Sequence, residues 1–139
     1  MSWSSPHFVA VKSMIQRDPV LDVSDAMKRT VEGAPFRGSY VILWPAGPET
    51  VDDGRLSKNQ DMASDAEYVY DGQAVAVDPL GVLYVIDRVV AQVMGQRPEV
   101  AGRRCDPIRV SVDPVDSDSK ILPPLFYARF ELSFWSRRP

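Results

Sequence analysis

The first apolar pattern in the chain is that of a short amphipathic helix over residues 6–17. Ser5-Pro6 supplies a capping hydroxyl and a proline suited to the first helical turn. The apolar side chains of one helical face are Phe8, Val11, Met14 and Ile15. Asp18-Pro19 ends this helix, because the residue before a proline avoids the α region.

A second short helix is expected from Ser24, which can cap it, to Gly33, a usual C-terminal residue. Met27 and Val31 lie four residues apart within it. We therefore interpret residues 1–38 as an N-terminal helical region.

Two strands are expected next. Residues 39–44 (Ser-Tyr-Val-Ile-Leu-Trp) are β-branched and aromatic and stop at Pro45, which is typical of a mostly buried strand. Residues 67–77 place Tyr68 and Tyr70 on one face, and Gly72 within this run indicates a bulge or a turn.

Asp78-Pro79 repeats the combination of cap and proline and begins the main helix, over 79–95. Its predicted apolar stripe is Leu83, Ile86, Val90 and Val93, widened by Val82, Val85 and Val89. So broad a surface predicts a helix that packs on a sheet with one side and contacts something else with the other. Gly95 ends it.

The last strands are predicted over 108–112 and 125–134, and the second of these has the clearest period of two in the chain. Its alternating apolar residues are Phe126, Ala128, Phe130, Leu132 and Phe134. The order of elements predicts an α+β fold, with a mixed or antiparallel sheet of about four strands and helices packed on one face.

Length and composition fit one domain over residues 1–139, with the sheet and main helix in 39–136. No apolar run approaches the roughly 20 residues that span a bilayer, and Met1 is not followed by a basic signal region. We expect a soluble protein that is not exported by a classical signal and has no membrane partner.

Few residues could carry chemistry. Cys105 and His7 are the only cysteine and histidine, which excludes an intrachain disulfide and a Cys/His zinc site. The glycine patterns of phosphate-binding loops are absent. We interpret His7 as an exposed or partly packed residue of the first helix, and Cys105 as a small apolar residue at a strand start. No catalytic residue, metal or cofactor is expected.

Charge is distributed unevenly. The net charge of −3 argues against a general nucleic-acid binder. Residues 46–78 carry eight acids against Arg55 and Lys58, and they include a long polar loop expected over 46–64. The acids are Glu49, Asp52, Asp53, Asp61, Asp65, Glu67, Asp71 and Asp78. Residues 97–109 carry four arginines against Glu99 and Asp106.

Several short motifs together resemble one protein family. They are Tyr40-Val-Ile-Leu-Trp-Pro, the strand and helix from Tyr68 to Gly95, Gly102-Arg-Arg-Cys-Asp-Pro-Ile, and Leu122-Pro-Pro-Leu-Phe-Tyr. In this order the chain resembles the tail terminator (tail completion) proteins of long-tailed (siphovirus) phages of actinobacteria. It departs from them in entering the helix through Asp78-Pro79 and in its long loop after Pro45.

The resemblance implies a structural virion protein, made in the host cytoplasm and located at the head-proximal end of the tail. Such a protein forms a ring, usually a homohexamer, that caps the tail tube, ends its polymerisation and docks the head. The implied partners are other copies of the chain, the major tail tube protein and the head-tail connector or neck proteins. Genomic DNA would pass through the ring without specific binding.

Two charged sets are candidates for these contacts. Arg103, Arg104 and Arg109 are predicted to serve a subunit or neck interface, because planar guanidinium groups pair well with carboxylates. Asp52, Asp53 and Asp61 are predicted to face the channel or a neighbouring subunit, since an acidic lining does not retain DNA phosphates.

Two other classes remain open from the sequence. The chain could be a head-tail connector or stopper of the phage neck, which shares small α/β construction and ring symmetry. It could also be a small cytosolic enzyme, which would require a pocket with convergent polar groups and perturbed titratable residues.

Overall fold

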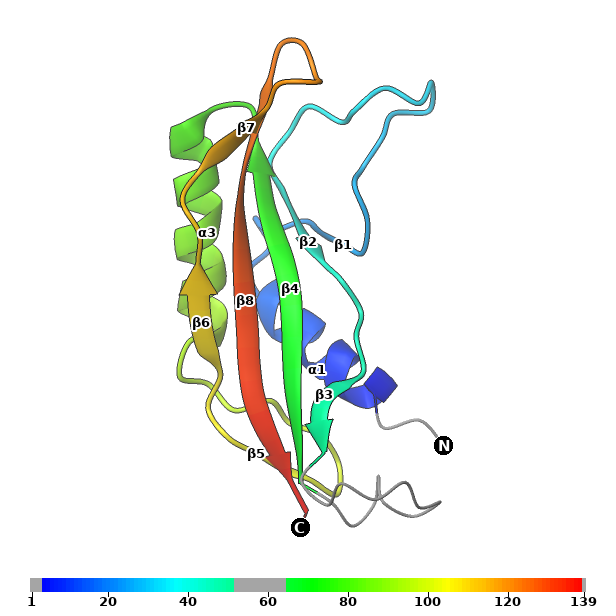
Figure 1. The fold of residues 1–139 in the computed structure, drawn as a ribbon, viewed down its shortest axis with the longest axis vertical. Helices are drawn as coiled ribbons and strands as arrows, with labels where there is room; N and C mark the ends of the chain where they lie inside the picture. The colour runs from blue at the N-terminus through cyan, green and yellow to red at the C-terminus, as the bar shows by residue number, and fades with distance from the viewer. Residues whose placement is uncertain (1–3, 52–64, 139) are drawn as a thin grey trace.

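Two long antiparallel strands form the centre of the sheet. The computed structural model describes residues 4–51 and 65–138. In it, β4 (Ala66–Ala76) pairs along its whole length with β8 (Leu125–Arg137), from Ala66 opposite Ser136 to Ala76 opposite Phe126. Figure 1 shows this pair running along the long axis of the molecule. Alternate residues of β8 are buried from Ala128 to Ser136, which confirms the predicted period of two.

Short strands flank the central pair on both sides. β2 (Tyr40–Leu43) and β3 (Pro48–Val51) pair with β4, and β1 (Val23–Ser24) lies parallel to β2. On the other side, β5 (Arg104–Cys105), β6 (Arg109–Val112) and β7 (Asp116–Asp118) each pair with β8. The mixed sheet has eight strands among the described residues.

The predicted α+β class is confirmed, and four of the strands are those expected from the sequence. The additional strands are β1, β3, β5 and β7, which have two to four residues each. β1, β5 and β7 are too short to display a hydrophobic period, and the sequence of β3, Pro-Glu-Thr-Val, lacks the apolar character of β2; the ladder to a long neighbour stabilises such strands. β3 corrects the expectation of a structureless loop at its residues, and the rest of that loop, residues 52–64, lies outside the described residues.

Helices α1 (Ser4–Gln16) and α3 (Pro79–Val93) cover one face of the sheet, behind it in the view of Figure 1. The Asp78 carboxylate caps α3 by accepting a 2.5 Å hydrogen bond from the Gly81 amide, as the sequence predicted. The buried stripe of α3 is Val82, Val85, Ile86, Val89 and Val93. Leu83, placed in the predicted stripe, is 46% exposed, because the helix is rotated so that Val82 faces the sheet.

The predicted second helix over 24–33 is wrong. After β1 the chain forms an irregular hairpin, closed by an isolated bridge between Arg29 and Pro35. Gly33, with φ of 87°, donates its amide to the Thr30 carbonyl at 2.9 Å within this hairpin. Met27 and Val31 are both exposed. Two apolar residues cannot hold an isolated turn of helix when neither reaches a core.

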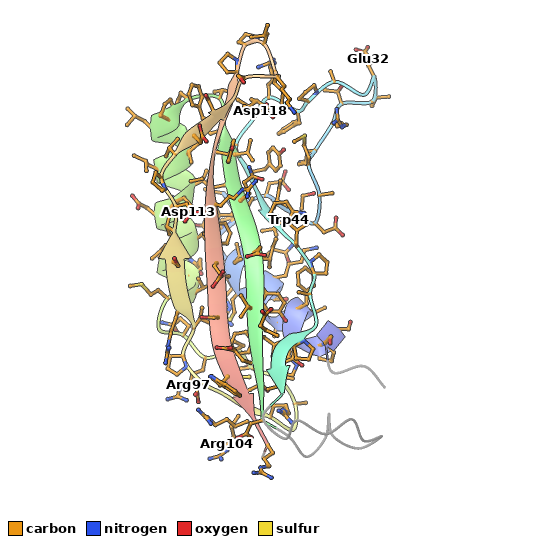
Figure 2. The ribbon with its side chains drawn as sticks, in the orientation of Figure 1. Glu32, Trp44, Arg97, Arg104, Asp113 and Asp118 are labelled. Carbon is orange, nitrogen blue, oxygen red and sulfur yellow. The ribbon has the colours of Figure 1, made fainter. Side chains whose placement is uncertain are left out.

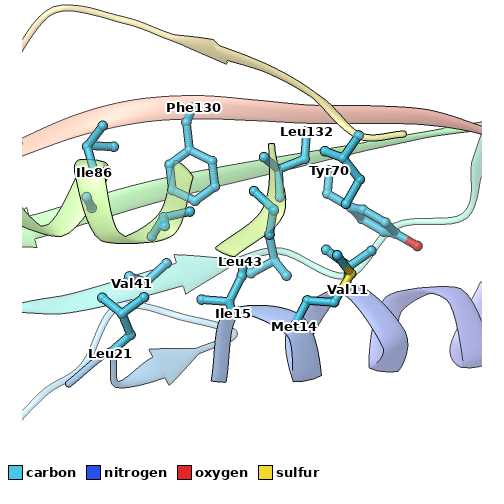
Figure 3. Packing of buried hydrophobic residues seen from close by; sticks show 14 of the residues in the cluster. Val11, Met14, Ile15, Leu21, Val41, Leu43, Tyr70, Ile86, Phe130 and Leu132 are labelled. Carbon is cyan, nitrogen blue, oxygen red and sulfur yellow. The ribbon is translucent and has the colours of Figure 1, made fainter. Parts of the chain in front are cut away.

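The main core lies between the helices and the sheet, and Figure 3 shows side chains from both layers meeting in it. Gly72 lies on the face of β4 that borders this core. It is not a bulge, because its pairing with Phe130 continues the regular register of β4 and β8. The Phe130 ring occupies the space where a Gly72 side chain would stand. The prediction of a bulge or turn at Gly72 is therefore wrong, since close ring approach is what requires glycine here.

A smaller apolar cluster lies on the other face, which we call the open face because neither helix covers it. Its buried members are Tyr40, Ile42, Val75 and Leu125. Residues of the hairpin and of the β7–β8 connection pack on this cluster, including Phe36 and Ile121. The remainder of the open face, toward the middle of β4 and β8, carries exposed polar residues such as Asp71 and Glu131.

Candidate functional site

The arginines predicted for a subunit or neck contact follow α3. Arg103 comes after Gly102, whose φ of 77° favours glycine, and Arg104 begins β5 beside the end of β8. Figure 2 shows Arg104 with Arg97 at this end of the molecule. Arg109 begins β6 and shares the open face with its partner Ser133. Their predicted roles stay predictions.

A buried polar cluster joins three distant segments at this end. His7 of α1 and Ser136 of β8 are both fully buried, and His7 Nε2 lies 2.7 Å from Ser136 Oγ. Arg103 donates from Nε to Ser136 Oγ at 2.9 Å and from Nη2 to the Ser136 carbonyl at 2.8 Å. The His7 ring also stacks on Tyr68, with centroids 4.0 Å apart.

The interpretation of His7 as an exposed or partly packed residue is wrong. The helix carries it over β4, where ring stacking and the hydroxyl of Ser136 satisfy it. A histidine beside a serine suggests a nucleophile and its base, but a substrate must reach both. Neither side chain has exposed surface, so this pair holds α1 against the sheet.

Cys105 is buried at the start of β5, as the sequence predicted. Burial raises the pKa of its thiol, although the hydrogen bond from Ser136 and the charge of Arg103 act in the opposite direction. The thiol is therefore protonated at neutral pH and is a poor nucleophile.

Ion pairs connect the end of β8 to the neighbouring segments. Arg137 donates to Asp106 from Nη2 at 2.8 Å and from Nε at 3.1 Å, and it lies 3.6 Å from Asp65. The hydrogen bonds from Arg137 lower the pKa of Asp106. Asp65 also accepts the Arg138 amide at 3.0 Å. Part of the acidic set is therefore used within the subunit.

The other predicted acids have separate fates. Asp52, Asp53 and Asp61 lie outside the described residues. Asp78 caps α3, as described above. Asp71 is exposed on the open face. Among the described acids, Asp65 contacts Arg137 and Arg138, Asp78 caps α3 and Asp71 lies on the open face, so these three do not form one surface.

A hollow of about 440 Å³ on the open face was not foreseen from the sequence. Asp71 and Glu131 stand directly opposite each other in the β4–β8 register, and both line the hollow. Asp113, Arg129 and Trp44 line it as well, and Trp44 is 37% exposed. Only the strand register brings these residues together.

The described residues also lack the features of two other kinds of site. No group of three or more His, Cys, Asp or Glu side chains there has the arrangement of a metal site. No helix in the same part of the chain is long and apolar enough to cross a membrane.

Comparisons with known proteins give a match in structure alone. No protein-family model and no curated protein matches the sequence. Among solved structures, a chain of "Virion of native gene transfer agent (GTA) particle" aligns with a TM-score of 0.63. The alignment covers 99% of this chain and 98% of that chain, at 18% sequence identity. At this identity the match establishes a shared fold.

Proposed function

We propose that this protein is a structural component of a virion, and that it forms the ring which terminates the tail of a long-tailed phage. The observation that carries the proposal is the fold shared with a chain of a gene transfer agent virion over nearly the full length of both chains. The motifs that resemble actinobacteriophage tail terminators supply the finer assignment.

In this proposal the work of the protein is binding. Identical subunits, six in the homohexamer that the resemblance implies, would close into a ring on the last turn of the tail tube. One surface would meet the major tail tube protein and the opposite surface the head-tail connector or neck proteins. The genome would pass through the central opening without specific binding, which suits a chain with a net charge of −3.

The interior of the fold is consistent with a structural role. The most enzyme-like constellation in the described residues, His7 with Ser136, is fully buried and held by Arg103. These contacts connect α1 to the last strand, which gives the subunit a rigid end suitable for assembly.

The test asks whether the protein binds purified tail tubes or purified heads. Labelled protein is mixed either with tail tubes assembled from the accompanying major tail tube protein or with DNA-filled heads, and electron microscopy locates the label. The proposal predicts binding at one end of the tubes, with tube growth stopped when the protein is added during polymerisation.

Two results would contradict the assignment as a tail terminator. Binding to heads alone would favour a connector or stopper of the neck. Uninterrupted tube growth at saturating protein concentration would contradict termination. A variant such as Glu32→Lys, altered at an exposed turn, serves as the control for charge effects on binding.

A further inference from the structure

The uncovered part of the open face carries an electrostatic conflict. Asp71 and Glu131 lie opposite each other on adjacent antiparallel strands, a position in which like charges destabilise a sheet. Asp113 lies on the same face, because its amide donates to the carbonyl of Arg129 at 2.8 Å and the two residues stand side by side. The hollow is thus lined by three carboxylates and one guanidinium group, that of Arg129. None of these carboxylates forms an ion pair with Arg129.

The surroundings of this hollow suit a second guanidinium group. Trp44 is 37% exposed and lines the hollow, and its backbone amide donates to the Asp71 carbonyl at 3.1 Å, which fixes the backbone that carries the indole. An aromatic face beside carboxylates favours arginine, through cation–π contact and paired hydrogen bonds.

The end of the molecule that bears β5 presents the complementary charge. A second hollow, of about 750 Å³, is lined by Arg97, Arg103 and Arg104, with Glu99 as its acid. Arg97 and Arg104 are exposed, and each makes a single hydrogen bond to a main-chain carbonyl, of Cys105 at 3.2 Å and of Arg138 at 3.4 Å. Most of their donors therefore face solvent.

The two surfaces cannot meet within one subunit. Figure 2 shows Trp44 and Asp113 near the middle of the molecule, while Arg97 and Arg104 lie at one end. A head-to-tail contact between identical subunits joins two different patches, and opposite charge on the two patches favours that contact.

We propose that the acidic hollow of the open face is a subunit interface that receives Arg97 and Arg104 of a second copy of this chain. The inference rests on the proposed function, since a closed ring of identical subunits must join two different surfaces. The incoming guanidinium groups would relieve the repulsion between Asp71 and Glu131. The same two carboxylates would therefore affect both the association of subunits and the stability of the sheet.

The test compares the unaltered full chain with four variants by sedimentation velocity over a range of concentrations. Glu131→Lys should raise the dissociation constant of the assembly about tenfold or more. It should also raise the melting temperature of the subunit by about 1 to 3 °C, because a repulsive cross-strand pair becomes attractive. Weaker assembly with a more stable subunit is a combination that damage to the fold cannot produce.

Arg104→Glu should weaken assembly to a similar degree, and the double variant Glu131→Lys with Arg104→Glu should restore it to within about threefold of the unaltered chain. The control Glu32→Lys makes the same charge change at the exposed hairpin, far from both hollows, and should assemble normally.

The proposal is overturned if Glu131→Lys assembles like the unaltered chain, if the double variant is no better than the single ones, or if the unaltered chain stays monomeric. Failure of the proposed function is a separate result. A two-fold dimer controlled by the charge exchange would support this interface and contradict the ring, whereas rings insensitive to these charges would contradict only the interface.

Discussion

The replacement Gly72→Ala should destabilise the protein, although the same change in an unconstrained strand would stabilise it. The φ of Gly72 lies outside the left-handed region, so alanine can adopt the backbone. A β-carbon at this position would stand 2.9 Å from Phe130 Cε1 and closer still to Cε2 and Cζ. Phe130 is 3% exposed and belongs to the main core, so its ring cannot turn outward without opening that core.

Two opposing effects determine how much the free energy of unfolding changes in Gly72→Ala. Removing the conformational freedom of glycine stabilises a strand by roughly 0.5 to 1 kcal/mol. Forcing extra atoms into a packed core costs about 1 to 3 kcal/mol. The free energy of unfolding of Gly72→Ala should therefore fall by about 1 to 2 kcal/mol, measured by urea titration with tryptophan fluorescence.

A double-mutant cycle isolates the contact. Phe130→Leu shortens the ring side chain and leaves a cavity, which alone should cost about 1 to 2 kcal/mol. In the double variant the alanine methyl group fills that space, so the combined cost should be smaller than the sum by at least about 0.5 kcal/mol. Gly47→Ala is the matched control, because its β-carbon would make ordinary contact with Ser4 Oγ at 3.4 Å. Unchanged or increased stability of Gly72→Ala, or strictly additive costs, would refute this reasoning.

Three further predictions concern buried polar groups. Tyr70→Phe should raise the free energy of unfolding by about 1 kcal/mol, because the buried Tyr70 hydroxyl has no hydrogen-bond partner and burial raises its pKa; a loss of stability would contradict this. Ser136→Ala should lower it by about 1 to 3 kcal/mol, since His7 loses its partner in the core, and calorimetry that finds no change would argue against the cluster. The hydrogen bonds of Arg88 hold the pKa of Asp18 below its ordinary value of 3.8, so their stabilising effect is complete above that value and is lost as pH falls through the folded-state pKa. The stability gap between the unaltered chain and Arg88→Ala should accordingly close in acid, and a gap independent of pH would exclude this linkage.

The candidate site was predictable only in part. The sequence shows that arginines are concentrated in residues 97–109, and in the structure Arg97, Arg103 and Arg104 line one hollow. It could not indicate that Arg103 is held by Ser136, 33 residues away, or that Asp71 faces Glu131. Those pairings depend on strand register, and a shift of a single residue would move every side chain to the other face.

The sequence by itself determined the elements whose burial is periodic. The alternation of β8, the apolar stripe and cap of α3 and the amphipathic α1 follow from regular exposure to a core on one side, and together they predict the α+β class. Tertiary structure decided the remaining features. The short strand β3, the buried His7 and the glycine under Phe130 each depend on a partner in another element, and the hairpin in place of a second helix packs through Phe36 on a cluster that includes Leu125. Local propensity contains no information about such partners, because their energies exist only once the sheet has formed.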